Sequence, residues 1–326
     1  MADPASRRLT LLVGIVVLVL LALPAGVGRY PLYLAIQILI LSVFAVGFNL
    51  LFGYTGLLSF GQAGFFAVGA YACAKILLAI PNLLLGLLGG VVAAAIAALV
   101  LGFLSVRHTR IYFSMLTLAW GMLIFSAAWK WRSFTGGDNG LVGIPRAPIV
   151  LGPLSIGVDT LPRYYYVVLI TSLLAIWIMY RIVHSPLGLT LQAIRDSETR
   201  AAFAGVPVAT YRLVAFTIAG VYAGLAGALL PALENTVTPP IAHWSASAEP
   251  IMATLLGGIH IFGGPIVGAF LLFMIKDIIV RFTEHWLIWL GVIVVALVMG
   301  FRGGVASIFA ARLRPRILAQ APQSRS

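Results

Sequence analysis

The sequence is poor in charge and nearly free of cysteine. Only 9% of its 326 residues are charged, and its single cysteine, Cys73, lies inside an apolar run. These features exclude a disulfide framework and a thiolate metal site, and Cys73 is expected to be a small buried hydrophobe. The five histidines are scattered, without a pair at the spacing with which a helix holds a metal ion. We therefore expect no metal site.

Lysine is equally scarce. The lysines are Lys75, Lys130 and Lys276, and none of them follows a glycine. The phosphate-binding motif G-x-x-x-x-G-K-[ST] is therefore absent, so the chain is not expected to hydrolyse ATP itself. No nucleophile stands with a credible base, which disfavours an enzyme. We expect a protein that is not an enzyme and holds no cofactor.

Apolar residues dominate what is present. The hydrophobic fraction is 61% and the mean hydropathy is +1.07, more apolar surface than a soluble domain could cover. An all-α integral membrane protein with about ten transmembrane helices is predicted. The expected spans are Leu9–Val27, Pro31–Phe52, a run from Gly56 to about Ile80, Leu83–Ser105, Ile111–Trp129, Tyr164–Ile182, Tyr211–Leu230, a broken run over about Ser245–Phe262, a run ending at Phe282, and Trp286–Phe301.

The basic residues indicate the orientation of a single transmembrane domain over residues 1–326. With the N-terminus inside, thirteen arginines fall on the cytoplasmic side and six basic residues fall outside, namely Arg29, Lys130, Arg132, Arg146, Arg163 and Arg281. An even number of crossings keeps both termini cytoplasmic, with a basic tail at 302–326. A Gly- and Pro-rich segment, 132–163, is then an ordered external loop. The first run could instead be a cleaved signal peptide, but its length favours a retained anchor.

One cytoplasmic stretch, 184–210, is too polar for hydrocarbon. Six consecutive polar residues, 195–200, would wet every side of a helix, and a central Asp or Arg costs roughly 2.5–3.5 kcal/mol in a membrane. Within the stretch, Pro186 and Gly188 precede a helix that Gly205 and Pro207 follow, so it has a start and a stop. A helix over 189–204, roughly 24 Å long, is predicted to project into water and to dock a soluble partner. The alternative is a connecting loop without a partner.

Ionisable residues within the spans would mark an ion-driven transporter. Lys276 and Asp277 are adjacent and point in different directions on a helix, so each is expected to pair with a neighbouring helix or to face a wet crevice. A proton relay there is the alternative. Glu234 and Glu249 are expected at the outer side, where they could contact a partner.

Five segments in order carry a resemblance that covers nearly the whole chain. They are NLLFGYTGLLSFGQAGFFAVGAY, FTGGDNGLVGIP, IRDSETRAAFAGV, LLGGIHIFGGPIVGAF and GFRGGV. Together they resemble the LivM-type permease of the branched-chain amino acid ABC importer family. The resemblance implies an ABC-importer permease fold of the vitamin-B12-importer kind. It also implies a multi-pass protein of the bacterial inner membrane whose coupling helix lies between the sixth and seventh spans.

The resemblance also implies how the cytoplasmic stretch works. Glu198, Ala201, Ala202 and Gly205 look like a degenerate form of the EAA…G motif of importer permeases, with altered spacing. Small side chains would seat the backbone in a groove of an ATPase, and charges would fix its register. The residues expected to couple to the ATPase are Arg195, Asp196, Glu198, Arg200, Ala201, Ala202 and Gly205.

A path for an amino acid needs hydrogen-bond partners for its ammonium and carboxylate groups. Six polar side chains in the early spans are candidates for lining it: Asn49, Thr55, Ser59, Gln62, Ser114 and Thr117. For each of them, a hydrogen bond between helices is the simpler alternative.

The resemblance further implies partners. These are a second homologous permease subunit, two cytoplasmic ATPase subunits that use the ATP, and a periplasmic substrate-binding protein that selects the ligand. The residues leave open the substrate, since similar permeases also serve urea, short amides and other small carboxylates. They also leave open whether the second permease is identical. An ion-gradient-driven transporter or channel remains the alternative function, and it is disfavoured because only Asp277 among nine acidic residues lies clearly within a span.

Overall fold

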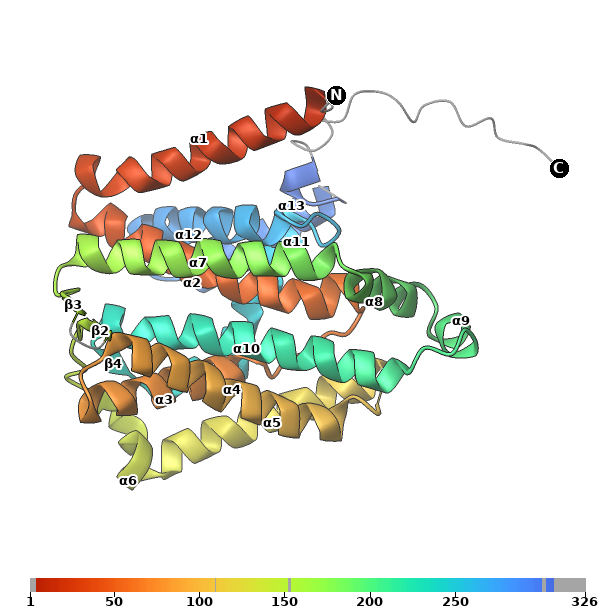
Figure 1. The fold of residues 1–326 in the computed structure, drawn as a ribbon, viewed down its shortest axis with the longest axis horizontal. Helices are drawn as coiled ribbons and strands as arrows, with labels where there is room; N and C mark the ends of the chain where they lie inside the picture. Colours follow the sequence, from red (N-terminus) through yellow and green to blue (C-terminus); the bar gives the residue numbers. More distant parts are fainter. Residues whose placement is uncertain (1–3, 109, 152–153, 301–302, 308–326) are drawn as a thin grey trace.

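The computed structural model describes residues 4–108, 110–151, 154–300 and 303–307, and it shows a bundle of roughly aligned helices (Figure 1). Six described helices are long and apolar enough to cross a membrane on their own. They are α2 (Arg29–Asn49) with the π-helix η1 (Leu50–Tyr54), α3 (Gln62–Ala79), α4 (Leu83–Ser105), α5 (Arg110–Lys130), α7 (Leu161–Val183) and α10 (Val208–Glu234).

Four further helices lie where the remaining expected spans were placed. They are α1 (Pro4–Gly26), α11 (Ala248–Gly257), α12 (Gly264–Phe282) and α13 (Trp286–Gly300). An all-α membrane protein is thus confirmed, while the count of ten crossings stays a prediction. The 10-residue α11 is about 15 Å long, half of a bilayer core. Of the expected basic tail, 302–326, only residues 303–307 lie within the described part.

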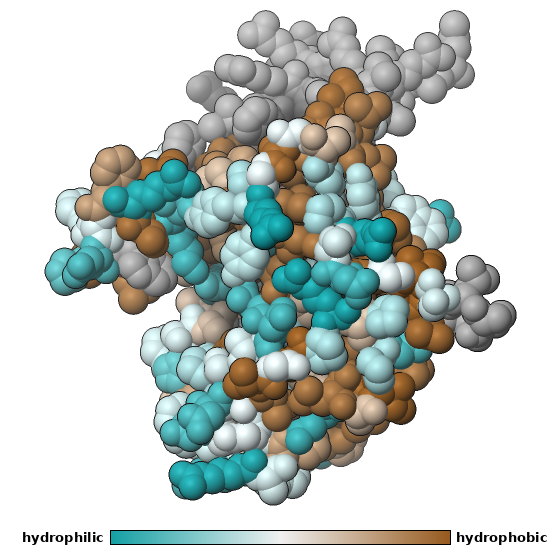
Figure 2. All heavy atoms as spheres, turned by 90° about the vertical axis from the view of Figure 1, so that its left-hand side faces the viewer, coloured by the Kyte–Doolittle hydropathy of each residue, from teal (hydrophilic) through white to brown (hydrophobic). Residues whose placement is uncertain are grey.

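The loops gather at the two ends of the bundle (Figure 1). One end carries α8 (Pro186–Asp196) and α9 (Glu198–Phe203). The other carries α6 (Arg132–Thr135), η2 (Gly137–Asn139), the antiparallel pair of β2 (Ile149–Leu151) and β3 (Leu154–Ile156), and β1 (Leu141–Val142), which pairs with β4 (Thr236–Val237). Figure 2 shows hydrophilic residues gathered over this second end, between more hydrophobic flanks. The segments 184–210 and 132–163 therefore lie at opposite ends.

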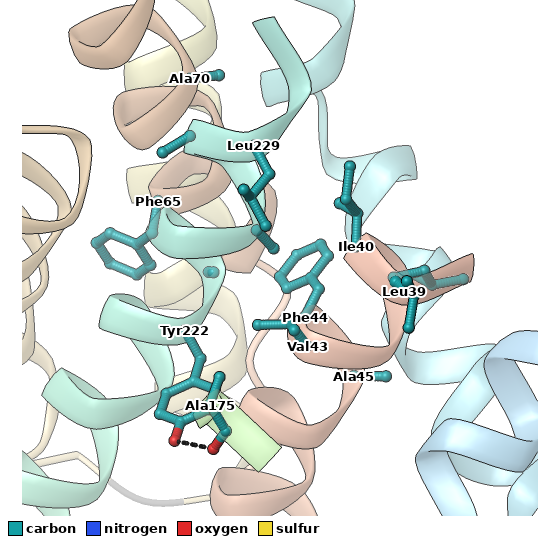
Figure 3. Packing of buried hydrophobic residues seen from close by; sticks show 14 of the residues in the cluster. Leu39, Ile40, Val43, Phe44, Ala45, Phe65, Ala70, Ala175, Tyr222 and Leu229 are labelled. Atoms are coloured by element: carbon teal, nitrogen blue, oxygen red, sulfur yellow. Dashed lines mark hydrogen bonds between the residues drawn. The ribbon is translucent and has the colours of Figure 1, made fainter. Parts of the chain in front are cut away.

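The core lies where α2, α3 and α10 meet. Phe44 of α2 stacks on Phe66 of α3 with ring centroids 5.2 Å apart. Tyr222 of α10 donates a hydrogen bond of 2.7 Å to the carbonyl of Ala175 in α7, which ties a fourth helix to the core (Figure 3). The polar end of the tyrosine is thereby satisfied far from water. Most of α2 is buried, so it is the central helix of the bundle.

Glycines let α3 and α10 approach closely, as the small residues of the sequence predict. A Cβ on Gly69 would lie 2.2 Å from the carbonyl oxygen of Gly224, and a Cβ on Gly227 would lie 1.9 Å from that of Phe66. Both distances are too short for any carbon. The two backbones therefore touch, and these positions admit no side chain.

Two crossings are interrupted. The third span was expected to run on from Gly56, but helix α3 begins only at Gln62, and residues 55–61 form a non-helical segment after η1, in which buried and more exposed residues alternate. Gly56 has a φ of +75°, a conformation that favours glycine, which is one reason why the helix stops there. After α10, the chain passes through the short 3-10 helices η3 (Pro239–Ala242) and η4 (Trp244–Ser247) before α11, and it turns again at 258–263.

The α3–α10 contact yields a test of the packing. Gly227→Ala places a methyl group against the Phe66 carbonyl, and overpacking of this kind costs about 1–3 kcal/mol. We expect a lower midpoint of thermal unfolding for the variant in detergent. Gly291→Ala is the control, because a Cβ there meets nothing within 4 Å. Equal midpoints for the two variants would show that the helices do not meet this closely.

Candidate functional site

The polar stretch between α7 and α10 folds as two short helices rather than one. Helix α8 ends at Asp196, and Ser197, with φ −162° and ψ 102°, breaks the chain before α9. The Ser197 side chain accepts a hydrogen bond from the Arg200 amide, so it caps α9. The expectation of a continuous helix over 189–204 is therefore wrong, because Ser197 prefers to cap a new helix. We call 186–205 the coupling segment.

Arg195 points inward, toward the end of α2. Its Nη1 donates a 2.6 Å hydrogen bond to the carbonyl of Gly53 in η1 and lies 3.4 Å from Nδ1 of His260. Its Nε and Nη2 bond Oδ1 of Asp196 at 3.2 and 3.1 Å. The side chain is only 28% exposed. Arg195 thus contacts three parts of its own chain.

Glu198 and Arg212 hold α9 against α10. Both terminal nitrogens of Arg212 donate to the carboxylate of Glu198, at 2.8 and 2.7 Å. The Arg212 side chain is 8% exposed and that of Glu198 is 46% exposed. A bidentate pair of this kind fixes orientation as well as distance. Sequence reasoning did not identify Arg212, whose place at the start of an apolar span gave only a topology signal.

The remaining residues expected to couple divide by exposure. Ala201 is buried against its own chain, whereas Arg200 and Ala202 are exposed. Gly205 ends the segment with φ +83°, and its amide bonds the Ala202 carbonyl at 2.9 Å. A Cβ on Gly205 would meet nothing within 4 Å, so this glycine is required by its left-handed conformation and not by crowding within the chain.

Phe203 was missed by sequence reasoning, which read the stretch for small and charged residues. Its side chain is 88% exposed at the end of α9, at an end of the bundle where polar helices project. Because aromatic side chains are enriched among the residues that carry binding energy at interfaces, Phe203 is a candidate contact residue. Its signal in the sequence was a lone aromatic within the polar run ETRAAFAG.

Three of the six candidate path residues hold the non-helical segment 55–61 in place. Ser114 donates to the Leu58 carbonyl at 2.6 Å, and Thr117 accepts from the Phe60 amide at 3.3 Å. Thr55 donates to the Leu50 carbonyl at 2.9 Å. These hydroxyls supply partners that the broken helix lacks, which fits the alternative of structural hydrogen bonding, and a role in the path stays a prediction.

The other three have polar atoms without a protein partner. The buried atoms are Oδ1 of Asn49, Oγ of Ser59, and both amide atoms of Gln62, whose side chain is fully buried. Unpaired buried polar groups are costly and rare, and water or a ligand commonly satisfies them. Asn49 lies before the first interruption (residues 55–61), Ser59 lies within it, and Gln62 begins α3 directly after it.

The turn at 258–263, which is the second interruption, meets the first interruption at its glycines. A Cβ on Gly53 would lie 2.7 Å from the Ile259 carbonyl. Gly258 has φ +113°, and a Cβ on Gly304 would lie 2.3 Å from its Cα. Deeper in the bundle, the Ala63 amide donates to Ser247 Oγ at 3.0 Å. The segments 53–56, 258–260 and 303–304 therefore converge beside Arg195, and we call them the convergent turns.

Three ionisable residues of the spans, Glu234, Lys276 and Asp277, have polar partners. Lys276 lies 3.6 Å from Glu249 of α11, and Asp277 binds Arg281 at 2.7 Å and Tyr30 of α2. Lys276 thus pairs with a neighbouring helix, as expected, whereas the ion pair of Asp277 lies within α12 and only Tyr30 reaches it from another helix. Glu234 accepts from Tyr33 at 2.5 Å and from Gln37 at 3.1 Å. No group of metal-binding side chains occurs among the described residues.

The glycine-rich loop at the opposite end is ordered by left-handed glycines. Gly136, Gly137 and Gly140 have φ of +81°, +66° and +68°. A Cβ on Gly140 would lie 2.1 Å from the Val237 carbonyl, so the loop packs directly on β4. Glycine adopts a positive φ without steric strain, which explains why the run GGDNG forms this turn.

Comparison with known proteins gives consistent matches. The sequence model of a family described as "Branched-chain amino acid transport system / permease component" matches residues 30–310. The high-affinity branched-chain amino acid transport system permease protein LivM of Salmonella typhimurium is 28% identical over 91% of this chain and 75% of that protein. LivM of Escherichia coli is 29% identical over 85% of this chain and 70% of that protein.

A more distant relative is the probable branched-chain amino acid transport permease protein LivH of Methanocaldococcus jannaschii. It is 23% identical over 74% of this chain and 77% of that protein. No solved structure gives a significant match to the chain.

The Glu198–Arg212 pair generates a test of the site's local structure. Glu198→Ala leaves the buried Arg212 guanidinium without its charged acceptor, a loss of about 1.5–3 kcal/mol for a hydrogen bond to a charged group. We expect α9 to open more often and trypsin to cleave faster after Arg200. Glu284→Ala, which removes an exposed carboxylate between α12 and α13, is the control. Unchanged cleavage in Glu198→Ala would mean that the pair does not hold α9.

Proposed function

Because this chain belongs to the branched-chain amino acid transport permease family, as its motifs predicted, we propose that it is the permease subunit of an ATP-driven ABC importer. Its proposed substrates are branched-chain amino acids. The observation that carries this proposal is the coupling segment, a folded polar element fixed to the bundle by Arg195 and Arg212. A permease without a nucleotide-binding motif requires such an element if conformational changes of a separate ATPase are to drive transport.

The proposed assembly contains a second homologous permease, two cytoplasmic ATPase subunits and a periplasmic substrate-binding protein in the inner membrane. In this assembly the coupling segment faces the cytoplasm, and both termini lie on that side. The ordered turn at Gly136–Gly140 lies at the opposite end, which supports a place near the binding protein. Its rigidity suits a contact surface, since an ordered loop loses little entropy on binding.

The proposed path for substrate passes the first interruption. Asn49, Ser59 and Gln62 offer both donors and acceptors that no protein group satisfies. An amino acid carries a carboxylate and an ammonium group, which need such partners away from water. Non-helical backbone at membrane depth is tolerated where it is buried in protein or lines a cavity, and broken helices commonly flank transport sites.

The rival function, an ion-gradient-driven transporter or channel, finds little support. It requires a carboxylate that can release and bind an ion within the membrane. Asp277 is held by Arg281 and Tyr30, and Glu249 lies beside Lys276. A carboxylate that is already neutralised by a basic partner is a poor ion carrier.

Docking of the ATPase is proposed to centre on Phe203. The exposed residues of α9 surround it with charge, from Glu198 and Arg200, and with the small side chain of Ala202. Aromatic residues within a polar rim supply most of the binding energy at interfaces. Burial of this side chain would also remove an unfavourable apolar surface from water.

The first test concerns the energy source. The chain, its second permease, the ATPases and the binding protein are reconstituted in proteoliposomes, and leucine uptake is measured with and without ATP. We expect uptake only with the complete assembly and ATP, because the chain cannot bind nucleotide by itself. Uptake by the permeases alone under an imposed ion gradient would favour the rival function.

The second test concerns the docking surface. Phe203→Ala removes the exposed ring, and a loss of about 2 kcal/mol corresponds to roughly 30-fold weaker ATPase binding. Binding of the purified ATPase to the permease in detergent measures this. Phe282→Ala is the matched control. Phe282 is 84% exposed, but it is the last residue of α12 and lies at the end of this helix that is away from the coupling segment. Equal affinities for both variants would remove Phe203 from the interface.

A further inference from the structure

Arg195 joins the coupling segment to the interrupted end of the central helix. The helix formed by α2 and η1 ends at Tyr54, and the last carbonyls of any helix lack partners within it. The Gly53 carbonyl, in this last turn, accepts the 2.6 Å hydrogen bond from Arg195. A guanidinium at this position also complements the negative end of the helix dipole. Arg195 is therefore a cap supplied by another helix.

The same guanidinium reaches the second interruption. His260, 3.4 Å from Nη1 of Arg195, lies in the turn between α11 and α12. That turn touches the first interruption through Ile259 and Gly53. One side chain thus contacts both breaks at the point where they meet.

A cavity of about 360 Å³ lies between part of the coupling segment and the start of the first interruption. Thr55, Gly56 and Leu57 line it on one side, and residues 194–199 together with Arg212 line the other. The side chain of Arg195 crosses beside this cavity, with its Cγ 3.0 Å from the position that a Cβ on Gly56 would take. The coupling segment and the first interruption are therefore linked here by a side chain rather than by flat packing.

We propose that Arg195 is a positioning residue that transmits movement of the coupling segment to the convergent turns, and that it is not a contact residue for the ATPase. This inference rests on the proposed function. When the docked ATPase moves α8 and α9, two hydrogen bonds to the single oxygen Oδ1 of Asp196 hold the guanidinium in place relative to α8. The bond to Gly53 then displaces the end of α2, and His260 carries the turn before α12 in the same direction.

Glycine at the convergent turns lets them respond as a unit. The contacts among Gly53, Ile259, Gly258 and Gly304 are between backbones, without side chains to slide past one another. The π-helical geometry of η1 is a feature that often occurs at functional sites within helices. Displacement at Gly53 is thereby passed to the interruption that carries Ser59 and leads into α3 at Gln62.

The experiment compares Arg195→Ala and Arg195→Lys with Arg181→Ala in the reconstituted assembly. Arg181 is an exposed arginine in the last turn of α7, at the same end of the bundle. Leucine uptake per ATP hydrolysed is the readout. We expect Arg195→Ala to bind the ATPase with unchanged affinity but to transport about tenfold less per ATP, because hydrolysis then proceeds without displacing the convergent turns. Arg195→Lys should fall between, since an ammonium can bond Gly53 without the fork that holds Asp196.

A second readout follows the transmission directly. Hydrogen exchange of the amides at 53–57 is compared between nucleotide-free and ATP-trapped assemblies. We expect a difference in the wild type and in Arg181→Ala, and its loss in Arg195→Ala. If Arg195→Ala fails to fold, Arg195→Lys carries both measurements.

The outcomes separate the inference from the function on which it rests. Wild-type uptake that needs no ATPase would overturn the proposed function itself. ATP-driven wild-type uptake together with unchanged uptake per ATP in the Arg195 variants would overturn the inference alone. Weaker ATPase binding by Arg195→Ala would also overturn it, because Arg195 would then be a docking residue.

Discussion

The structure depends on one constraint, which is that backbone groups within a membrane must find partners inside the protein. Continuous helices meet it by themselves, but two crossings here are interrupted. Side chains from neighbouring segments supply the missing partners: Ser114 and Thr117 bond the segment 55–61, Ser247 bonds the start of α3, and Arg195 caps η1. An interruption is stable only where these helices are correctly placed, so the breaks and the bundle that surrounds them require one another.

The glycine contacts serve this constraint as well. Close approach of α3 to α10 at Gly69 and Gly227 fixes the helix that begins after the first interruption. At the other end of that interruption, Gly53 lets the turn before α12 touch η1. The middle of the bundle and the convergent turns thus use the same residue type. It allows dense packing in the middle of the bundle and left-handed turns at its end.

The sequence predicted the membrane class, the positions of the helices, the polar segment between α7 and α10 and the family. Long apolar runs and breaker residues carry these signals locally. The interruption at 55–61 was not predicted, because GLLSFGQAG is apolar enough for a helix and its partners, Ser114 and Thr117, lie on α5. The inward direction of Arg195 and the pairing of Arg212 depend on contacts between distant residues. Hydropathy and spacing do not contain that information. The role of Asn49, Ser59 and Gln62 stays a prediction, and the structure adds only their unpaired atoms.

The break at Ser197 divides the coupling segment into parts that can evolve separately. The proposed docking of the ATPase involves α9, a six-residue helix anchored on α10 by Glu198 and Arg212. Arg195 belongs to α8, on the other side of the break. Substitutions confined to α9 can therefore change which ATPase a permease accepts while the link to the membrane helices is preserved. Duplicated permeases in one cell could acquire separate ATPases, or share one, by exchanging the sequence of α9.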